Sequence, residues 1–403
     1  MKIIINAFST QLPQDQKVYD DAAKVLSWNR WLLTVLGIWP KNPSEIRFGI
    51  NFGYFCYHML MEYLDLCLFI SNLEHVIENL TENMAFSQIL IRMAMLKRYN
   101  KPLGTVIDEV FKDFDYRKYK TIEESDAFIK YNKRSKLFVK LLSAFVVLTA
   151  SSYYVKPLTA KPPEDLSIVI PENASATYEL PYRFHVFYKI EDDQTYLYTY
   201  LSQLPFVFVS GFGQSAADCL MVTLVFHVCG QMSILAMRIS KINSNADSCE
   251  EELREIVKDH NRLLQMGTVV QEAFSETLLG HLIGATSLVC ILGYQVLTNF
   301  AKGQNADLVT FITFAFLVLL VLYAHCTVGE SLITESLNVC NAFYDCEWYN
   351  MPTKKARVII ICMARSQKPL CLTAGKFGIF CLSTLTEVLK TAMGYLSVLR
   401  TLL

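Results

Sequence analysis

The feature that most constrains this chain is an apolar segment too long for one ordinary membrane crossing. Residues 196–237 run for 42 positions with a single formal charge, Asp218. Because a helix rises about 1.5 Å per residue, the segment would extend about 63 Å, roughly twice the hydrocarbon thickness of a bilayer. It therefore forms either two short spans that divide near Gly211-Phe212-Gly213, or one span that continues into the cytosol.

Six other segments have the apolar character of a membrane span, which needs about 20 residues. They are 46–70, 80–97, 137–155, 273–300, 308–337 and 371–399. The chain is 52% hydrophobic and 19% charged, whereas soluble domains are about 25% charged. These values indicate an all-α membrane protein, and the net charge of −1 excludes the strong basic field of a nucleic-acid-binding protein.

The segment 26–40 is apolar but shorter than a span, and it ends at Pro40. We predict an interfacial helix here, anchored by Trp28, Trp31 and Trp39, because tryptophan favours the membrane–water boundary. This helix belongs to a cytoplasmic N-terminal region, residues 1–45.

The distribution of lysine and arginine decides between the two interpretations of the long segment, because cytoplasmic loops carry an excess of both residues. With one long fourth helix and a cytoplasmic N-terminus, the inner segments hold 25 Lys and Arg and the outer segments 5. If the segment is split into two spans, the inner and outer segments hold nearly equal numbers of Lys and Arg. We therefore predict seven spans, a cytoplasmic N-terminus, an extracellular C-terminus and a fourth helix that extends into the cytosol. Both permitted glycosylation sequons, at Asn79 and Asn173, fall on the predicted outer side.

Signatures of catalysis and metal binding are missing from the sequence. It contains no nucleophile-elbow, metalloprotease, P-loop or dinucleotide motif, no C-x-x-C pair, and no two histidines at i, i+4 spacing. We expect neither an enzyme nor a bound cofactor or metal. The twelve cysteines fit buried apolar positions.

Ionisable residues inside predicted spans are expensive and suggest function or specific pairing. Glu62 and Asp65 share one face of the first span, where they either contact neighbouring helices or attract cations. For Asp218 in the fourth span, we expect a structural contact rather than a binding role. In the last span, Glu387 and Lys390 either neutralise each other or border a water-filled path.

Aromatic and hydroxyl side chains gather at the predicted outer ends of the second, third, fourth and sixth spans. They form either an interfacial aromatic belt or a shared apolar pocket with a few hydroxyl groups, suited to a small volatile or lipophilic ligand. The residues we predict to bind such a ligand are Phe86, Leu90, Val147, Ser151, Tyr154, Tyr198, Ser202, Phe311 and Phe314.

The C-terminal stretch carries the most specific motif. Residues 368–377 read KPLCLTAGKF, followed by Ser383-Thr384-Leu385 and by YLSVLR at 395–400. This stretch resembles the last-helix signature of the insect odorant receptors, as do the length near 400 residues and the LGIWP run at 36–40. The resemblance implies a ligand-gated, non-selective cation channel in the plasma membrane of sensory neurons.

The same resemblance implies a tetramer with a shared odorant receptor coreceptor, surrounded by membrane lipid. The last helix would line the pore, with the gate at Val398 and with Thr401 and Leu402 beyond it. The chain lacks the coreceptor's long inner-loop insertion, which implies a ligand-specific tuning subunit. Residues 46–337 would then hold the first six spans and the outer ligand pocket, and residues 338–403 the cytoplasmic anchor and the pore helix.

Two other receptor classes are alternatives. A G-protein-coupled receptor would need an extracellular N-terminus, and the sequence has neither D-R-Y nor N-P-x-x-Y in the required places. A gustatory-type receptor channel would end its last helix with T-Y-x5-Q-F, whereas this chain has Gly394-Tyr395 and then Thr401-Leu402.

Overall fold

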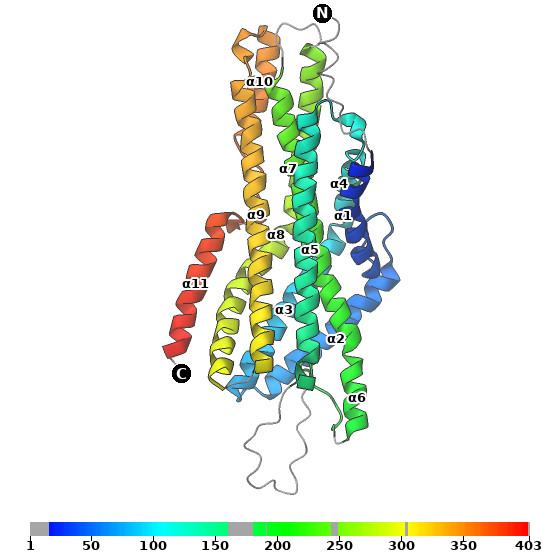
Figure 1. Cartoon of the computed structure of the whole chain (residues 1–403), viewed down its shortest axis with the longest axis vertical. Coiled ribbons are helices and arrows are strands. Elements are labelled where there is room, and N and C mark those ends of the chain that lie inside the picture. The colour runs from blue at the N-terminus through cyan, green and yellow to red at the C-terminus, as the bar shows by residue number, and fades with distance from the viewer. Residues whose placement is uncertain (1–15, 160–179, 191, 243–248, 303–304, 402–403) are drawn as a thin grey trace, which may run out of the picture.

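A computed structural model describes residues 16–159, 180–190, 192–242, 249–302 and 305–401. This part of the chain is a bundle of long helices (Figure 1). In chain order the α-helices are α1 (Gln16–Val35), α2 (Glu45–Leu68), α3 (Leu73–Arg98), α4 (Asn100–Lys112), α5 (Ile122–Thr159), α6 (Asp193–Ser202), α7 (Leu204–Ser240), α8 (Cys249–Lys302), α9 (Asn305–Asp345), α10 (Thr353–Ser366) and α11 (Leu382–Thr401). Two short 3₁₀ helices, η2 (Tyr116–Lys118) and η4 (Trp348–Asn350), and the strands β1 (Thr373–Ala374) and β2 (Gly378–Ile379) complete it.

The long apolar segment passes through Gly211-Phe212-Gly213 as one helix, which confirms the unsplit interpretation. A break separates α6 from α7 at Gln203, and Pro205 occupies the first turn of α7, where its missing N–H leaves no bond unmade. The Gln203 side chain holds the break by bonding both backbone groups of Tyr182, at 3.0 and 3.2 Å. From Ser215 to Met232 every residue of α7 is buried, because α3, α5, α8 and α9 all contact this helix.

The seven predicted spans correspond to α2, α3, α5, the α6–α7 segment, α8, α9 and α11. Four of these are long and apolar enough to cross a membrane within the described residues: 122–158, 193–240, 249–300 and 307–350. The helices extend beyond the predicted apolar limits, most clearly α8, which begins at Cys249. In contrast, α2 and α3 carry more charge, and the 20 residues of α11 include Glu387 and Lys390.

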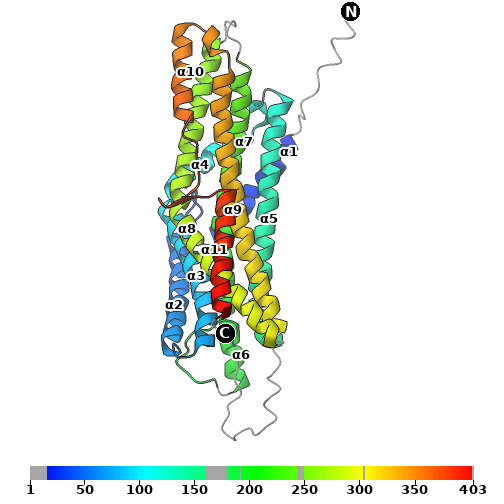
Figure 2. The same cartoon turned by 90° about the vertical axis from the view of Figure 1, so that its left-hand side faces the viewer.

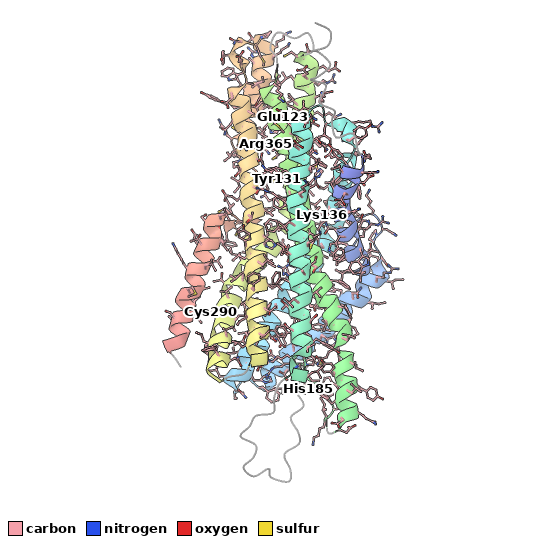
Figure 3. All side chains as sticks on the ribbon, in the orientation of Figure 1. Glu123, Tyr131, Lys136, His185, Cys290 and Arg365 are labelled. Atoms are coloured by element: carbon pink, nitrogen blue, oxygen red, sulfur yellow. The ribbon has the colours of Figure 1, made fainter. Side chains whose placement is uncertain are left out.

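The two ends of the bundle differ. We call them the α10 end and the α6 end after the helices that mark them (Figures 1 and 2). Glu123 and Arg365 lie toward the α10 end, whereas His185 lies at the α6 end (Figure 3). The described parts of the predicted inner segments 98–136, 238–271 and 338–370 lie toward the α10 end, and α5 finishes near α6 (Figure 1).

Two predicted boundaries are wrong. The N-terminal helix covers residues 16–35 rather than 26–40, because the chain turns at Gly37 with a φ of 77° that favours glycine. Trp39 is buried after this turn and therefore does not anchor the surface, whereas Trp28 and Trp31 are exposed.

The last predicted span begins too early. Residues 373–379 form a small antiparallel hairpin in which Thr373 pairs with Ile379, and Gly375 has a φ of 59°. The Gly375 N–H donates to the Ser275 carbonyl of α8 at 3.0 Å, so this segment is pinned to the bundle before α11 begins. From there α11 runs beside α8 and α9 toward the α6 end (Figure 2).

Candidate ligand cavity

A cavity lies among α3, α5, α7, α8 and α9, in the half of the bundle nearer to α6. Its volume is about 100 Å³, on a scale where a single water needs roughly 10–15 Å³. The space is therefore sufficient for a small organic molecule. Its walls are mainly apolar and aromatic, which is typical of small-molecule sites. They include Phe86, Ile89, Val146, Ala150, Tyr153, Tyr182, Leu288, Phe314, Leu317, Val318 and Val321.

Helix α5 presents one face to this cavity. Val146, Thr149, Ala150 and Tyr153 line it, at the i, i+3, i+4, i+7 spacing of a single helical face. Thr149 and Tyr153 are each about 6% exposed. Neither hydroxyl has a hydrogen-bond partner among the described residues, so this face of α5 brings two unpaired hydroxyl groups to the cavity wall. The Nε2 atom of His281 in the same wall also has no partner among the described residues.

One wall of the cavity is polar and carries Gln88, Arg92, Gln214 and His281. Arg92 is fully buried and bonds the Gln214 side chain at 3.0 Å. Its Nε lies 3.4 Å from the Asp218 carboxylate, which gives the positive charge a buried counterion.

Asp218 makes two more contacts from the same position. The Gln214 amide donates to it at 2.6 Å, and His325 Nε2 lies 3.2 Å away. The sequence prediction that Asp218 makes a structural contact is therefore confirmed. A buried charge without such partners would be strongly destabilising.

A second space, an apolar groove of about 400 Å³, lies on the outer side of α5 between α1 and α7. Trp28, Trp31, Val147, Ser151, Tyr154, Phe208 and Phe212 are among its lining residues. The groove is separated from the cavity by Val146, Ala150 and Gly211, which line both.

The predicted ligand residues divide between these places. Phe86 and Phe314 line the cavity, and Phe311 is buried beside it, with its ring 6.5 Å from that of Tyr153. Leu90 packs against the hydrophobic core instead. Val147, Ser151 and Tyr154 line the groove rather than the cavity, and Tyr198 and Ser202 are exposed on α6.

The predicted gate residues lie on or after the last helix. Val398 is 57% exposed in the single chain, on a helix that contacts α8 and α9. Thr401 is the last residue of α11, and Leu402 lies outside the described residues. Glu387 and Lys390 lie on the same helix, as predicted.

The geometry disfavours a glycan on Asn79. Its side chain is fully buried, and its amide donates to Asp65 at 3.0 Å and to the backbone carbonyl of Glu62 at 3.3 Å. An attached sugar would have to replace these bonds and leave the core. Asp65 also bonds His75 at 2.6 Å, so it contacts α3, as the structural interpretation expected. The other sequon, at Asn173, lies outside the described residues.

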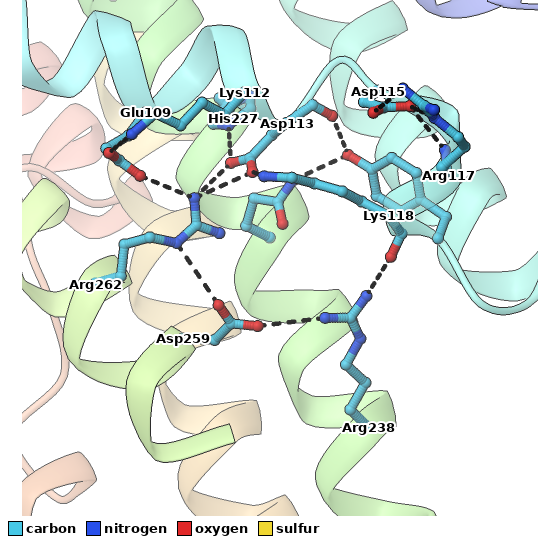
Figure 4. A network of polar contacts seen from close by, with 12 residues as sticks. Glu109, Lys112, Asp113, Asp115, Arg117, Lys118, His227, Arg238, Asp259 and Arg262 are labelled. Carbon is cyan, nitrogen blue, oxygen red and sulfur yellow. Dashed lines mark hydrogen bonds and ion pairs between the residues drawn. The ribbon is translucent and has the colours of Figure 1, made fainter. Parts of the chain in front are cut away.

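Toward the α10 end, a second polar network joins α4, α7 and α8 (Figure 4). Asp113 accepts from Arg262 at 2.9 Å and lies 2.9 Å from Lys118 and 3.1 Å from His227. Burial alone would raise the pKa of Asp113, but the hydrogen bond from His227 and the charges of Arg262 and Lys118 hold that pKa below its ordinary value. These contacts therefore stabilise the fold above the ordinary carboxyl pKa of about 3.9 and are lost only on stronger acidification.

Sequence reasoning missed Thr149, Tyr153, Gln88, Arg92, Gln214 and His281. The spacing of 146, 149, 150 and 153 marks one face of α5, but it does not reveal which face turns inward. A buried arginine in an apolar helix was a usable signal, because such a residue needs a partner on another helix.

Together, the four long apolar helices and the cavity inside the bundle define a multi-pass helical membrane protein with an internal binding space.

Comparison with known proteins identifies the family. The sequence model of the 7tm Odorant receptor family matches residues 72–393, and this chain belongs to that family. Odorant receptor 13a of Drosophila melanogaster is 30% identical over 208 residues, which cover 46% of this chain and 48% of the relative. Odorant receptor 85b of the same species is 26% identical over 228 residues, covering 56% and 57%. The chain thus spans about half the length of the curated relatives it matches.

The fold agrees with that of a solved structure. The insect olfactory receptor OR5 from Machilis hrabei in complex with eugenol superimposes with a TM-score of 0.76 over 95% of this chain and all of that chain, at 16% identity. The predicted seven-helix fold is confirmed, and the family is one of odorant receptors. The odorant receptor interpretation is therefore favoured over the two alternative receptor classes.

Proposed function

We propose that this chain is the ligand-specific subunit of an odorant-gated, non-selective cation channel. The observation that carries the proposal is the largely apolar cavity, large enough for a small volatile molecule, inside a chain of the odorant receptor family. The eugenol complex of the structurally similar OR5 supports a small organic ligand for this fold. The site of action would be the plasma membrane of sensory neurons.

The ligand would bind in the cavity against Phe86 and Phe314, with the inward face of α5 on one side. In this proposal the groove residues Val147, Ser151 and Tyr154 lie on the wrong face of α5 to contact the bound ligand. Because a ligand shifts an equilibrium only by its differential affinity for two states, it must fit the open arrangement of these helices better than the closed one.

Binding would reach the pore through α8 and α9, because both helices line the cavity and contact α11. Phe380, which precedes α11, is fully buried, with its ring 6.0 Å from that of His325 on α9. A shift of α9 would therefore move the base of α11. With the N-terminus in the cytosol and the C-terminus outside, α11 would line the pore and the Val398 ring would form a constriction that wets when it opens.

The proposal predicts a ligand-evoked cation current that depends on the partner subunit. Cells that express this chain with an odorant receptor coreceptor should respond to at least one compound in a screen of volatiles, whereas cells with either subunit alone should not respond to that compound. Whole-cell recording measures the current, and surface labelling of this chain provides the control for expression. If surface-expressed complexes respond to no volatile, or if the response persists without this chain, the proposal fails.

A further inference from the structure

The hydroxyl groups of Thr149 and Tyr153 in the cavity wall differ from others nearby in their hydrogen bonding. Ser210, which also lines the cavity, donates to the Val207 carbonyl at 3.0 Å. On the adjacent, groove-lining face of α5, Tyr154 donates to the Tyr200 carbonyl at 3.3 Å. Only for Thr149 and Tyr153 among these four does the described structure provide no partner. Buried hydroxyl groups are normally paired, and an unpaired one is unfavourable.

The two hydroxyl groups are also close in register. Thr149 and Tyr153 are four residues apart on α5, so their side chains lie one turn apart on the same face. Both line the same cavity. A single acceptor or donor atom of a bound molecule that approaches this face could therefore meet either group or both.

The Tyr153 ring is held by its neighbours. It stacks on Tyr182 with a centroid distance of 6.0 Å and meets the edge of Phe314 at 5.7 Å. These contacts keep the ring from turning its hydroxyl toward water. In this structure the packed ring holds its unpaired hydroxyl at the cavity wall, which is the preorganisation that a selective polar contact needs.

We propose that the cavity selects small ligands that carry one hydrogen-bonding oxygen, such as an alcohol, phenol or ketone, and that Tyr153 and Thr149 bind this oxygen. The hydrocarbon part of the ligand would lie against Phe86, Leu288 and Phe314. The inference rests on the proposed ligand site and specifies its chemistry. A site built to bond a ligand oxygen rejects the analogue without it much more strongly than an apolar pocket rejects a change of shape.

The test compares ligands of equal size with and without oxygen. Octan-1-ol is paired with nonane, and 2-phenylethanol with propylbenzene, each pair supplied at matched fractions of vapour saturation. Binding is measured as ligand-induced thermal stabilisation of the purified full-length chain, which requires no channel opening. At least one alcohol should stabilise the chain at a fraction of saturation at least about tenfold lower than its hydrocarbon partner, because one lost hydrogen bond to a buried group is worth about a factor of ten.

Two variants measure how much each hydroxyl group contributes to alcohol binding. Tyr153→Phe keeps the ring and should weaken alcohol binding about tenfold while leaving hydrocarbon binding unchanged. Thr149→Val should act in the same direction and provides a second test if the first variant does not fold. The matched controls are Tyr154→Phe and Ser151→Ala, which make equivalent changes on the groove face and should leave both ligands unaffected.

Equal binding of alcohols and hydrocarbons, no binding of either, or an equal effect of Tyr153→Phe and Tyr154→Phe would overturn the inference. Recording current from the same variants, expressed with the coreceptor, distinguishes a failure of the proposed channel function from a failure of the proposed ligand chemistry. Selective binding of alcohols without any evoked current would contradict the channel proposal and leave the ligand chemistry intact.

Discussion

Asp218→Asn should remove most of the folded protein from the cell surface. The substitution keeps the shape of the side chain but leaves Arg92, which is 2% exposed, without its counterion. Leaving one member of a buried ion pair uncompensated costs about 3–5 kcal/mol, a large fraction of the ~5–15 kcal/mol by which folded proteins are stable. Thermal unfolding of the detergent-solubilised protein, followed by fluorescence-detected gel filtration, measures the loss.

A double-mutant cycle shows that the effect comes from the pair. Arg92→Met alone should also destabilise the chain, whereas Arg92→Met combined with Asp218→Leu should recover much of the loss, because the interior then holds no unpaired charge. The control is Asp21→Asn, which removes an exposed carboxylate that pairs with Lys24 and Lys136 and should have little effect. Wild-type melting of Asp218→Asn would contradict the assigned role of the pair.

Locking the last helix at Val398 should abolish the ligand-evoked current. In a channel that contains two or more copies of this chain, the Val398 side chains of those copies would meet around the pore, so Val398→Cys would place their thiols close enough to cross-link. Oxidation should then hold the constriction closed, and a reducing agent should restore the current. Patch-clamp recording before and after each treatment measures both steps.

The background cysteines need a control for this experiment, because the chain has twelve of its own. Wild-type channels under the same oxidation, and Val147→Cys on the outward face of α5, should keep their current. Val147 is 65% exposed and lines the groove beside α1 and α7, whereas Val398 lies on α11. A current that survives a demonstrated cross-link at residue 398 would exclude Val398 as the gate.

Much of the architecture follows from the apolar pattern. The segment 196–237 contains one formal charge, so length and charge bias together indicated a single long helix, and α7 is that helix. The break at Gln203 was not predictable, because it depends on a side chain that bonds the backbone of Tyr182 in a separate segment. Likewise, the hairpin before α11 is fixed by a bond from Gly375 to Ser275 on another helix.

The sequence indicated some of the helices that line the cavity, but it did not indicate which face of each helix turns toward it. The predicted cluster includes residues of α3, α5 and α9, three of the helices that line the cavity, and Phe86 and Phe314 are among the lining residues. The residues chosen on the fourth span, Tyr198 and Ser202, lie on α6 instead, and the contribution of α8 was not predicted. On α5 the residues chosen were 147, 151 and 154, whereas 146, 149, 150 and 153 turn inward. A helix with apolar residues on both sides gives no sequence signal for its rotation, because the lipid side and the cavity side require similar residues.

The measurement that tests the central claim most directly is the odorant response of a receptor whose cavity has been filled. Ala85 on α3 also lines the cavity, and Ala85→Leu adds three carbon atoms to this space of about 100 Å³. Ser151→Leu places a larger side chain in the groove on the other face of α5 instead. If the cavity holds the ligand, then at equal surface expression with the coreceptor, Ala85→Leu should lose the evoked current and Ser151→Leu should keep it. An unchanged dose–response curve for Ala85→Leu, or loss of the response in Ser151→Leu alone, would contradict the account.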